Sequence, residues 1–263
     1  MQVKAVLFDL FDTLLLIDGD SEEGFYEPSL KRLHESLENE GINVAYEKFK
    51  HTYFGVRDRL YEETRVTLEE PHFNVRVVRT LKELGHDFTL SDKIVTGATA
   101  AFAKELTRYV ELDKDAMAVL QELKKHYKLG LVSNFAIPEC LHKLLAIFNL
   151  THFFDAVTVS GTINRRKPHP EIFQKTLTAL NVKPSEAAFV GDTRVADIKG
   201  AKDAEILAIL IERDSSPVEI SESLVWNPPK EKEPIMPDKV IRRLSELPIF
   251  FSEHLAETDN NVY

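Results

Sequence analysis

Five short apolar runs, separated for the most part by segments of helical periodicity, constrain the fold of this chain most strongly. The runs are Lys4–Phe8, Lys128–Val132, Ala156–Val159, Ala187–Val190 and Ile206–Ile211. A strand that is buried on both faces has this continuous apolar character. Strands that alternate with helices are joined by right-handed crossovers and form a parallel sheet. The pattern therefore predicts an α/β fold built on a parallel sheet.

Helical periodicity occurs in two parts of the chain. Asp113–Tyr127, Pro138–Asn149 and Pro170–Leu180 lie between predicted strands, and the last two begin with proline, which the first turn of a helix tolerates. The long stretch between the first two apolar runs contains no comparable strand. It has four helical segments instead, near Pro28–Glu40, Ala45–Thr67, Phe73–Leu84 and Ser91–Tyr109. We interpret this stretch as a helical module inserted into the α/β domain.

The boundaries of the predicted units follow from this reading. We place a discontinuous core at residues 1–17 and 112–250, the helical module at 18–111, and a polar C-terminal tail at 251–263. Asp18–Gly24 and Val110–Asp113 are the expected hinges. Within the core we expect an irregular, proline-rich stretch over Glu212–Asp238 and a final helix over Lys239–Leu247, followed by frayed residues from Ser252 onward.

Charge and composition restrict the partners. The chain has 33 Lys and Arg against 43 Asp and Glu, a formal net charge of −10. This disfavours binding to nucleic acid or to an anionic membrane, because both reward a positive surface. No apolar run approaches the roughly 18 residues that a membrane span needs. Cys140 has no second cysteine to pair with, and no signal-like segment opens the chain, so we expect a soluble, cytoplasmic protein. The sequence does not predict an oligomeric state.

Polar residues of matching chemistry follow four of the predicted strands. They are Asp9 and Thr13, then Ser133-Asn134, then Lys167-Pro168, and finally Gly191-Asp192 with Asp197. Ligands of open α/β sheets bind outside the carboxyl ends of the strands. We therefore expect these side chains to form one site.

The residue types suit phosphoryl transfer. An aspartate such as Asp9 can attack phosphorus and form an aspartyl-phosphate. Asp192 and Asp197 can hold Mg²⁺ together with Asp9 and a main-chain carbonyl, since this ion prefers hard oxygen ligands. Lys167 adds a fixed positive charge, and Ser133 can donate a hydrogen bond to a phosphoryl oxygen.

Each residue also has a plainer interpretation when it is taken alone. Asp9 can cap a helix, Ser133 can be a turn residue, and Asp197 can stabilise the start of a helix. The basic run Arg165-Arg166-Lys167 is typical of a solvated turn. Four motifs in order, each after a strand, favour the common site over these separate readings.

With these motifs the sequence resembles the haloacid dehalogenase (HAD) superfamily. The matching residues are Phe8-Asp9-Leu10-Phe11-Asp12-Thr13-Leu14, Ser133-Asn134, Lys167-Pro168, and Gly191-Asp192-Thr193 through Asp197. The resemblance implies a Rossmann-like three-layer core with an all-helical cap inserted after the first motif. It also implies a Mg²⁺-dependent hydrolase of a small anionic, phosphorylated metabolite.

The resemblance further assigns a role to each matching residue. Asp9 is the expected nucleophile, with Thr13 as its orienting neighbour. Ser133, Asn134 and Lys167 are the expected phosphate-binding residues. The expected Mg²⁺ ligands are Asp9, Asp192, Asp197 and the backbone carbonyl of Phe11.

Phe11 departs from the family pattern. Family phosphatases usually carry a second aspartate at this position as general acid and base, a function typically worth about 10²–10⁴ in rate. Asp12 stands where the family usually has glycine, and strand alternation points it away from Asp9. Three functions stay open: a phosphatase with a weakened or relocated acid/base that favours good leaving groups, a metal-independent dehalogenase-like hydrolase, and a low-turnover binding or regulatory protein. Cleavage of a phosphonate is a fourth open function.

The substrate contacts of the helical module are not assigned by the sequence. One helical pattern is shared by His51, Tyr53, Arg57, Arg59 and Arg65. It can face the crevice or the solvent, and we expect a solvated face.

Overall fold

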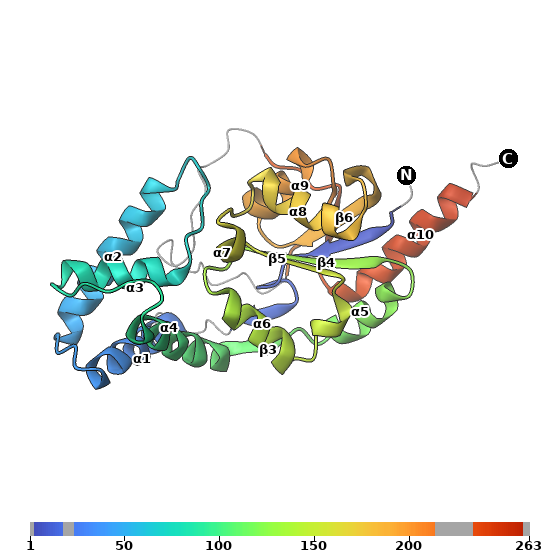
Figure 1. Ribbon diagram of the computed structural model, residues 1–263. Coiled ribbons are helices and arrows are strands. Elements are labelled where there is room, and N and C mark those ends of the chain that lie inside the picture. Colours follow the sequence, from blue (N-terminus) through green and yellow to red (C-terminus); the bar gives the residue numbers. More distant parts are fainter. Residues whose placement is uncertain (1–2, 18–23, 214–233, 260–263) are drawn as a thin grey trace.

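The computed structural model describes residues 3–17, 24–213 and 234–259, the last six as backbone only. Within these residues, six parallel strands form the central sheet in the order β5-β4-β1-β6-β7-β8 (Figure 1). They are β1 (Ala5–Phe8), β4 (Lys128–Ser133), β5 (Ala156–Val159), β6 (Ala187–Gly191), β7 (Leu207–Ile211) and β8 (Lys239–Ile241). All five predicted strands and their parallel arrangement are confirmed.

Helices cover both faces of this sheet. The helices α8 (Pro170–Leu180) and α9 (Gly200–Asp203) pack on one face, where their apolar side chains meet Ala5 and Leu7 of β1. On the other face, Val6 and Phe8 of β1 belong to a second cluster with α5 (Ala116–Lys124), α6 (Pro138–Ile147) and α10 (Leu247–Asp259). The side chains of β1 alternate between the two faces of the sheet and so contribute to both apolar clusters. This arrangement confirms the Rossmann-like three-layer architecture.

Four helices are inserted between β2 (Leu15–Ile17) and β3 (Val110–Leu112), and these two strands pair in antiparallel fashion. The helices are α1 (Tyr26–Asn39), α2 (Tyr46–Glu63), α3 (Phe73–Glu83) and α4 (Lys93–Leu106). They form a layer to one side of the sheet, on the left in Figure 1. On α1 the fully buried residues Leu30, Leu33 and Leu37 follow helical spacing, so one apolar face holds this helix in the core of the insertion.

Short helical turns connect these elements. They are α7 (Ser160–Ile163), the π-helical turn Arg194–Lys199, and the 3₁₀ turns Thr107–Tyr109, Thr151–Phe153, Pro184–Glu186 and Leu244–Glu246. Of the two predicted hinges, Val110–Asp113 contains β3, whereas residues 18–23 of the other lie outside the described residues.

The predicted final helix over Lys239–Leu247 is wrong. Lys239–Ile241 instead forms β8 beside β7, because the β-branched pair Val240-Ile241 suits an edge strand and Ile241 is buried there. The helix α10 starts only at Leu247, with Pro248 in its first turn, and continues to Asp259 through most of the predicted tail. Most of the predicted irregular stretch, residues 214–233, lies outside the described residues.

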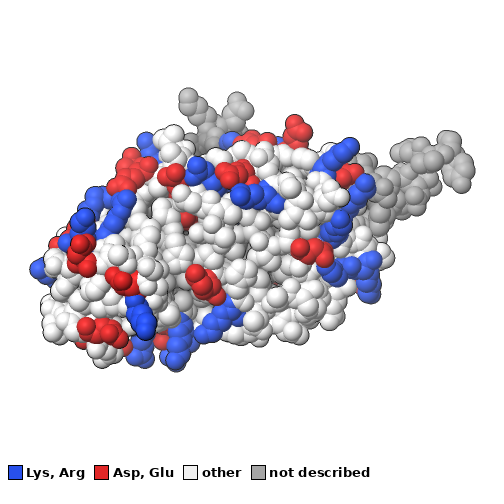
Figure 2. Space-filling model, viewed as in Figure 1, with Lys and Arg blue, Asp and Glu red and all other residues white. Residues whose placement is uncertain are grey.

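The surface carries charges of both signs. On the face shown in Figure 2, acidic and basic side chains are interspersed rather than gathered by sign. In the part of the chain that the structure describes, none of the helices combines the length and the apolar character that a membrane span requires.

Candidate active site

The strand order places the first motif at the centre of the carboxyl edge of the sheet. From β1 the chain builds outward through β4 and β5 on one side and through β6, β7 and β8 on the other, so β1 borders the topological switch point where ligands bind. Asp9 directly follows β1, and its backbone N–H donates to the carbonyl of Val190 at the end of β6. The Asp9 side chain is buried.

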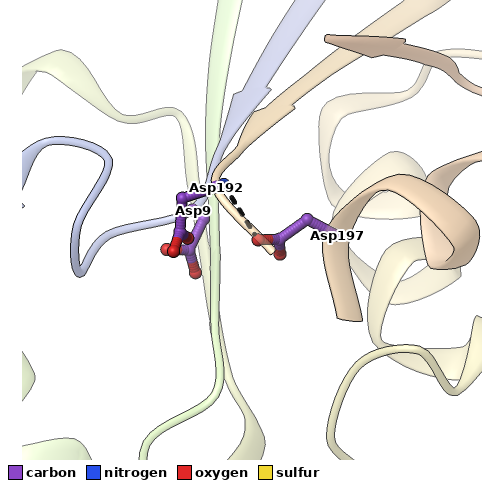
Figure 3. A group of neighbouring side chains, drawn as sticks. All are labelled: Asp9, Asp192 and Asp197. Atoms are coloured by element: carbon purple, nitrogen blue, oxygen red, sulfur yellow. Dashed lines mark hydrogen bonds between the residues drawn. The ribbon is translucent and has the colours of Figure 1, made fainter. Parts of the chain in front are cut away.

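Three carboxylates meet at this edge. One oxygen each from Asp9, Asp192 and Asp197 lies within 4.8 Å of the other two (Figure 3). Burial raises the pKa of Asp9 to about 7; the charge of Asp197 adds to this effect and that of Lys167 opposes it. Burial, followed by the charges of Asp197 and Asp9, raises the pKa of Asp192 well above its ordinary value. Hard oxygen donors that repel one another in a buried place fit a divalent cation such as Mg²⁺.

Lys167 joins two of these carboxylates. Its ammonium group forms ion pairs with Asp9 and, at 2.7 Å, with Oδ1 of Asp197, and its side chain is 2% exposed. Burial alone would lower the pKa of Lys167, but the charges of Asp197 and Asp9 raise it above its ordinary value. The lysine is therefore a fixed positive charge beside Asp9.

Asn134 holds the backbone around Lys167. Its Oδ1 accepts a hydrogen bond of 2.7 Å from the N–H of Lys167, and its Nδ2 donates to the carbonyl of the same residue at 3.1 Å. The amide predicted to bind substrate is thus engaged with the main chain, and it positions the lysine.

Asp197 organises the loop that carries Asp192. Its Oδ2 accepts hydrogen bonds from the N–H groups of Asp192 (3.1 Å) and Thr193 (2.9 Å), and from Oγ1 of Thr193 (2.6 Å). A Cβ atom on Gly191 would lie 2.5 Å from Cγ of Asp197. Glycine is therefore required at the end of β6 so that this carboxylate can reach the loop.

Two buried hydroxyl groups at the same edge have no partner among the described residues. They are Oγ1 of Thr13 and Oγ of Ser133, and both side chains are fully buried. Leaving a buried hydroxyl without a hydrogen bond costs about 1–3 kcal/mol. Both groups are thus available to oxygen atoms of a ligand.

Phe11 and Asp12 face different surroundings. The ring of Phe11 packs against that of Phe135, with centroids 4.9 Å apart. Asp12 has a φ of 57°, in the left-handed region that favours glycine. Burial raises the pKa of the Asp12 carboxyl, whereas a hydrogen bond from the backbone N–H of Ile17 and the charge of Arg213 oppose that rise. Asp12 is thus bonded to β2 and not to Asp9.

Arg213 is a residue of this region that the sequence analysis missed. Its guanidinium donates to the carbonyls of Asp12 (3.3 Å) and Thr13 (2.7 Å), and to Oδ2 of Asp113 at 2.7 Å. It therefore ties the loop after β1 to the residue after β3. An arginine after an apolar strand carries no signal of such a contact in the sequence.

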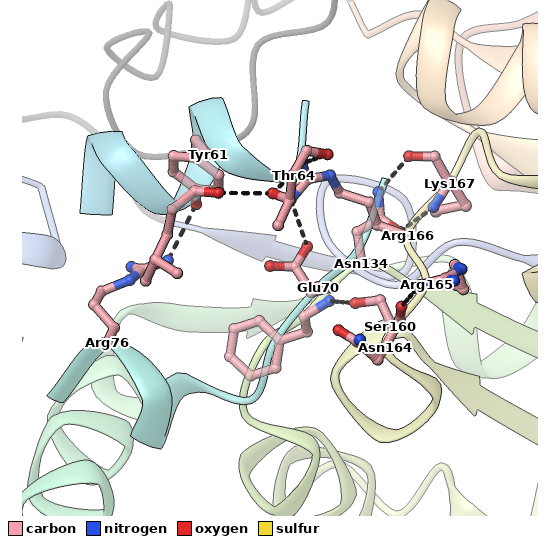
Figure 4. Close-up of polar contacts among 12 residues, drawn as sticks. Tyr61, Thr64, Glu70, Arg76, Asn134, Ser160, Asn164, Arg165, Arg166 and Lys167 are labelled. Atoms are coloured by element: carbon pink, nitrogen blue, oxygen red, sulfur yellow. Dashed lines mark hydrogen bonds and ion pairs between the residues drawn. The ribbon is translucent and has the colours of Figure 1, made fainter. Parts of the chain in front are cut away.

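The solvated-turn reading of the basic run is wrong for two of its three residues. Arg166 and Lys167 are 0% and 2% exposed, while Arg165 keeps partial exposure and pairs with Glu69. Arg166 extends from the core loop into the helical insertion, where it contacts Thr64. The basic run therefore links the core loop to the helical insertion (Figure 4).

Comparisons with known proteins agree with this geometry. A family model described as haloacid dehalogenase-like hydrolase matches residues 3–205, and one described as HAD-hydrolase-like matches residues 164–247. Glyceraldehyde 3-phosphate phosphatase of Methanopyrus kandleri is 31% identical over 218 residues, which cover 80% of this chain and 84% of that protein.

Solved structures show the same fold. A HAD phosphatase from Thermococcus onnurineus has a TM-score of 0.60 at 25% identity, covering 94% of this chain and 97% of that one. A 2-haloacid dehalogenase from Pseudomonas syringae has a TM-score of 0.65 at 22% identity, with coverages of 96% and 100%. On the family match and the Methanopyrus relative, this chain belongs to the haloacid dehalogenase-like hydrolases.

Proposed function

We propose that the protein is a Mg²⁺-dependent phosphatase of small phosphorylated metabolites, with Asp9 as the nucleophile. The observation that carries this proposal is the buried cluster in which Asp9 meets Lys167, Asp192 and Asp197. The similarity to a glyceraldehyde 3-phosphate phosphatase supports a phosphate monoester as substrate.

In the first step, a carboxylate oxygen of Asp9 attacks phosphorus, and the bond from phosphorus to the leaving oxygen breaks with its electron pair going to that oxygen. Lys167 neutralises charge on the phosphoryl group, and the hydroxyl groups of Thr13 and Ser133 donate hydrogen bonds to its oxygens. When bound to Asp9, Asp192, Asp197 and the carbonyl of Phe11, Mg²⁺ adds positive charge against the phosphoryl oxygens.

In the second step, water attacks the aspartyl-phosphate on Asp9, which releases inorganic phosphate and restores the carboxylate. Phe11 offers no proton to the leaving oxygen and accepts none from the water. The first step is therefore fastest with leaving groups that are stable as anions, such as those of acyl and aryl phosphates. This is the substrate preference that we expect.

The test is hydrolysis of para-nitrophenyl phosphate with Mg²⁺ and with EDTA. We expect metal-dependent turnover that Asp9→Asn abolishes, while Lys167 keeps its partner Asp197 and the variant stays folded. Chloride release from 2-chloro acids in EDTA would support the dehalogenase-like alternative instead. Inactivity in both assays, with Mg²⁺ still bound, would support a low-turnover binding or regulatory protein.

A further inference from the structure

Arg213 joins three segments that lie far apart in the chain. It follows β7, and its Nε and Nη2 donate to the consecutive carbonyls of Asp12 (3.3 Å) and Thr13 (2.7 Å) in the loop after β1. Its Nη1 donates to Oδ2 of Asp113, after β3, at 2.7 Å. The side chain of Arg213 is 21% exposed and that of Asp113 is 6% exposed, so water competes little for these hydrogen bonds.

The loop that Arg213 holds is a single turn. The N–H groups of Leu14 and Leu15 both donate to the carbonyl of Leu10, at 2.9 and 2.8 Å. One turn by itself is unfavourable in water, because it fixes several backbone dihedrals for few hydrogen bonds. Carbonyls at the end of a helical turn lack an intrahelical partner and carry partial negative charge, so a cation stabilises them. The guanidinium of Arg213 supplies this cation.

The backbone of Asp12 adds to the need for such support. Its φ of 57° lies in the left-handed region, which is unfavourable for a residue with a Cβ and persists only where neighbouring groups enforce it. The N–H of Asp12 donates to the carbonyl of Leu15 at 2.6 Å, and its carbonyl accepts from Arg213. Both peptide planes of Asp12 are therefore held. The first of these planes contains the carbonyl of Phe11, a proposed Mg²⁺ ligand.

Thr13 is the residue of the proposed mechanism that this arrangement can orient. Its Oγ1 is buried and has no partner among the described residues, while its carbonyl accepts a hydrogen bond from Arg213. A β-branched side chain has few favourable χ1 rotamers, so the direction of the hydroxyl group depends on the backbone. A hydrogen bond that fixes the peptide plane after Thr13 therefore also restricts where its hydroxyl group points.

Asp113 anchors the guanidinium. Its Oδ2 accepts from Arg213, and its Oδ1 accepts from the N–H of Asp115 at 2.8 Å. The N–H of Asp113 itself donates to the carbonyl of Leu14 at 2.9 Å. Both carboxylate oxygens are thus bonded, and this side chain is held in one direction. Because a guanidinium is planar and rigid, an anchor at one nitrogen sets the direction of the other two.

We propose that Arg213 is a positioning residue: anchored by Asp113, it fixes the turn after β1 and thereby directs the hydroxyl group of Thr13 toward the phosphoryl oxygens. The inference rests on the proposed phosphatase function and adds to it a residue outside the four motifs. In this role Arg213 acts through the backbone of the turn and not by contact with the substrate. A tie that only held the fold together would not depend on the hydroxyl group, and this difference can be measured.

The first test is Arg213→Gln, assayed with para-nitrophenyl phosphate and Mg²⁺. This variant loses the planar fork that reaches both carbonyls, so the hydroxyl group of Thr13 is no longer directed toward the phosphoryl group. We expect kcat/KM to fall about 10–100-fold, which corresponds to the loss of one hydrogen bond to a charged group. An unchanged kcat/KM would overturn the proposal.

Arg108→Gln is the matched control. It removes the same charge just before β3, but Arg108 is 67% exposed and pairs with Glu105. We expect wild-type kcat/KM; a fall as large as that of Arg213→Gln would trace the effect to lost charge and overturn the proposal. If Arg213→Gln does not fold, Arg213→Lys replaces it, because lysine keeps the charge beside Asp113 but has no fork to reach the two carbonyls. Wild-type kcat/KM in that variant would also overturn the proposal.

The decisive test combines Arg213→Gln with Thr13→Val, which stays close to the shape of threonine but has no hydroxyl group. If Arg213 acts through that hydroxyl group, Arg213→Gln should cost about twofold or less in the Thr13→Val background. A merely structural tie would cost the same factor in both backgrounds, because the effects of independent sites add. Equal losses would therefore overturn the proposal.

Binding of inorganic phosphate in the presence of Mg²⁺ separates this inference from the function on which it rests. The hydroxyl group of Thr13 meets phosphoryl oxygens in substrate and product alike, so calorimetry of the wild type, the two single variants and the double variant should show the same non-additive losses. If the wild type does not hydrolyse para-nitrophenyl phosphate, the phosphatase proposal fails, and this pattern in phosphate affinity would still support Arg213 as a positioning residue. Additive losses, or a wild type that binds no phosphate, would overturn it.

Discussion

The ring of Phe11 packs against that of Phe135 in a tilted arrangement, with an angle of 51° between the two planes. The two phenylalanines come from different motifs, one after β1 and the other after β4, and both are half-buried. The contact explains how the loop accommodates phenylalanine, since the ring fills space against another ring instead of standing in water. In the proposed mechanism residue 11 supplies no proton, which separates the attack on phosphorus by Asp9 from the transfer of a proton to the leaving group.

Phe11→Asp tests this separation. A carboxyl at residue 11 can protonate a poor leaving group, so we expect the rate on alkyl phosphates to rise by up to about 10²–10⁴. The rate on para-nitrophenyl phosphate should change little, because its leaving group needs no proton. Phe11→Asn is the matched control, because asparagine has the shape of aspartate but transfers no proton. An equal gain in rate from Phe11→Asn would refute the explanation. Steady-state kinetics with both substrates decides the matter.

Gly191→Ala should disable the site without unfolding the protein. The new Cβ would press on Asp197, which holds both the loop of Asp192 and the ammonium of Lys167. We expect a loss of at least about tenfold in Mg²⁺ affinity, in line with the effect of displacing a group that orients metal ligands. Calorimetric titration with Mg²⁺ measures this. Gly97→Ala is the control, because a Cβ there meets nothing within 4 Å, and its Mg²⁺ affinity should equal that of the wild type.

Binding of Mg²⁺ should depend on pH. The pKa of Asp9 is raised to about 7, so the metal must displace a proton at lower pH. We expect the affinity to rise from pH 5.5 to 7.5 and then to level off. A flat profile for the wild type would argue against Asp9 as a ligand that titrates in this range.

The same shift predicts how the metal-free protein responds to pH. A raised pKa means that the folded state binds the proton more tightly, so the contribution of Asp9 to stability is fully present below its ordinary pKa of 3.8 and is lost as pH rises through about 7. Thermal unfolding in EDTA should therefore show a steeper loss of stability between pH 5.5 and 8 for the wild type than for Asp9→Asn. Identical slopes would contradict the assignment of the raised pKa to this residue.

Cys140 should be inert in the native protein. Its thiol is buried between the core and the insertion, where Sγ lies 3.7 Å from the carbonyl of Ala103 in α4, and burial raises its pKa to about 12. We expect no reaction with a coloured thiol reagent at pH 8 within an hour, and complete reaction in guanidinium chloride. Rapid labelling of the folded protein would show that α4 and α6 separate readily.

Most of the sheet could be predicted from the sequence, because strands buried on both faces leave continuous apolar runs. The run Ala187–Val190 is an example, and it ends where the structure places Gly191 and Asp192. The strand β8 could not be predicted this way. It has only three residues, two of them exposed, so burial against β7 and not an apolar run decides its conformation.

The helical insertion shows where sequence reasoning stops. Its helices were predicted from the spacing of apolar residues. The expectation of a solvated face on α2 is wrong for Tyr53 and Arg57, which are 0% and 3% exposed. Tyr53 is buried because Arg76 of α3 and Tyr26 of α1 satisfy its hydroxyl. Partners that lie 23 and 27 residues away are set by tertiary packing. No local pattern encodes them.

The antiparallel pair of β2 and β3 has a consequence for how such a chain can diversify. The insertion leaves and rejoins the core through two adjacent three-residue strands, so its length and content do not alter the order of the sheet or the spacing of the motifs after β1, β4 and β6. In the proposed phosphatase, the residues that carry the chemistry follow β1, β4 and β6 and lie outside this insertion. The segment between β2 and β3 can therefore change in length and sequence while these residues stay in place.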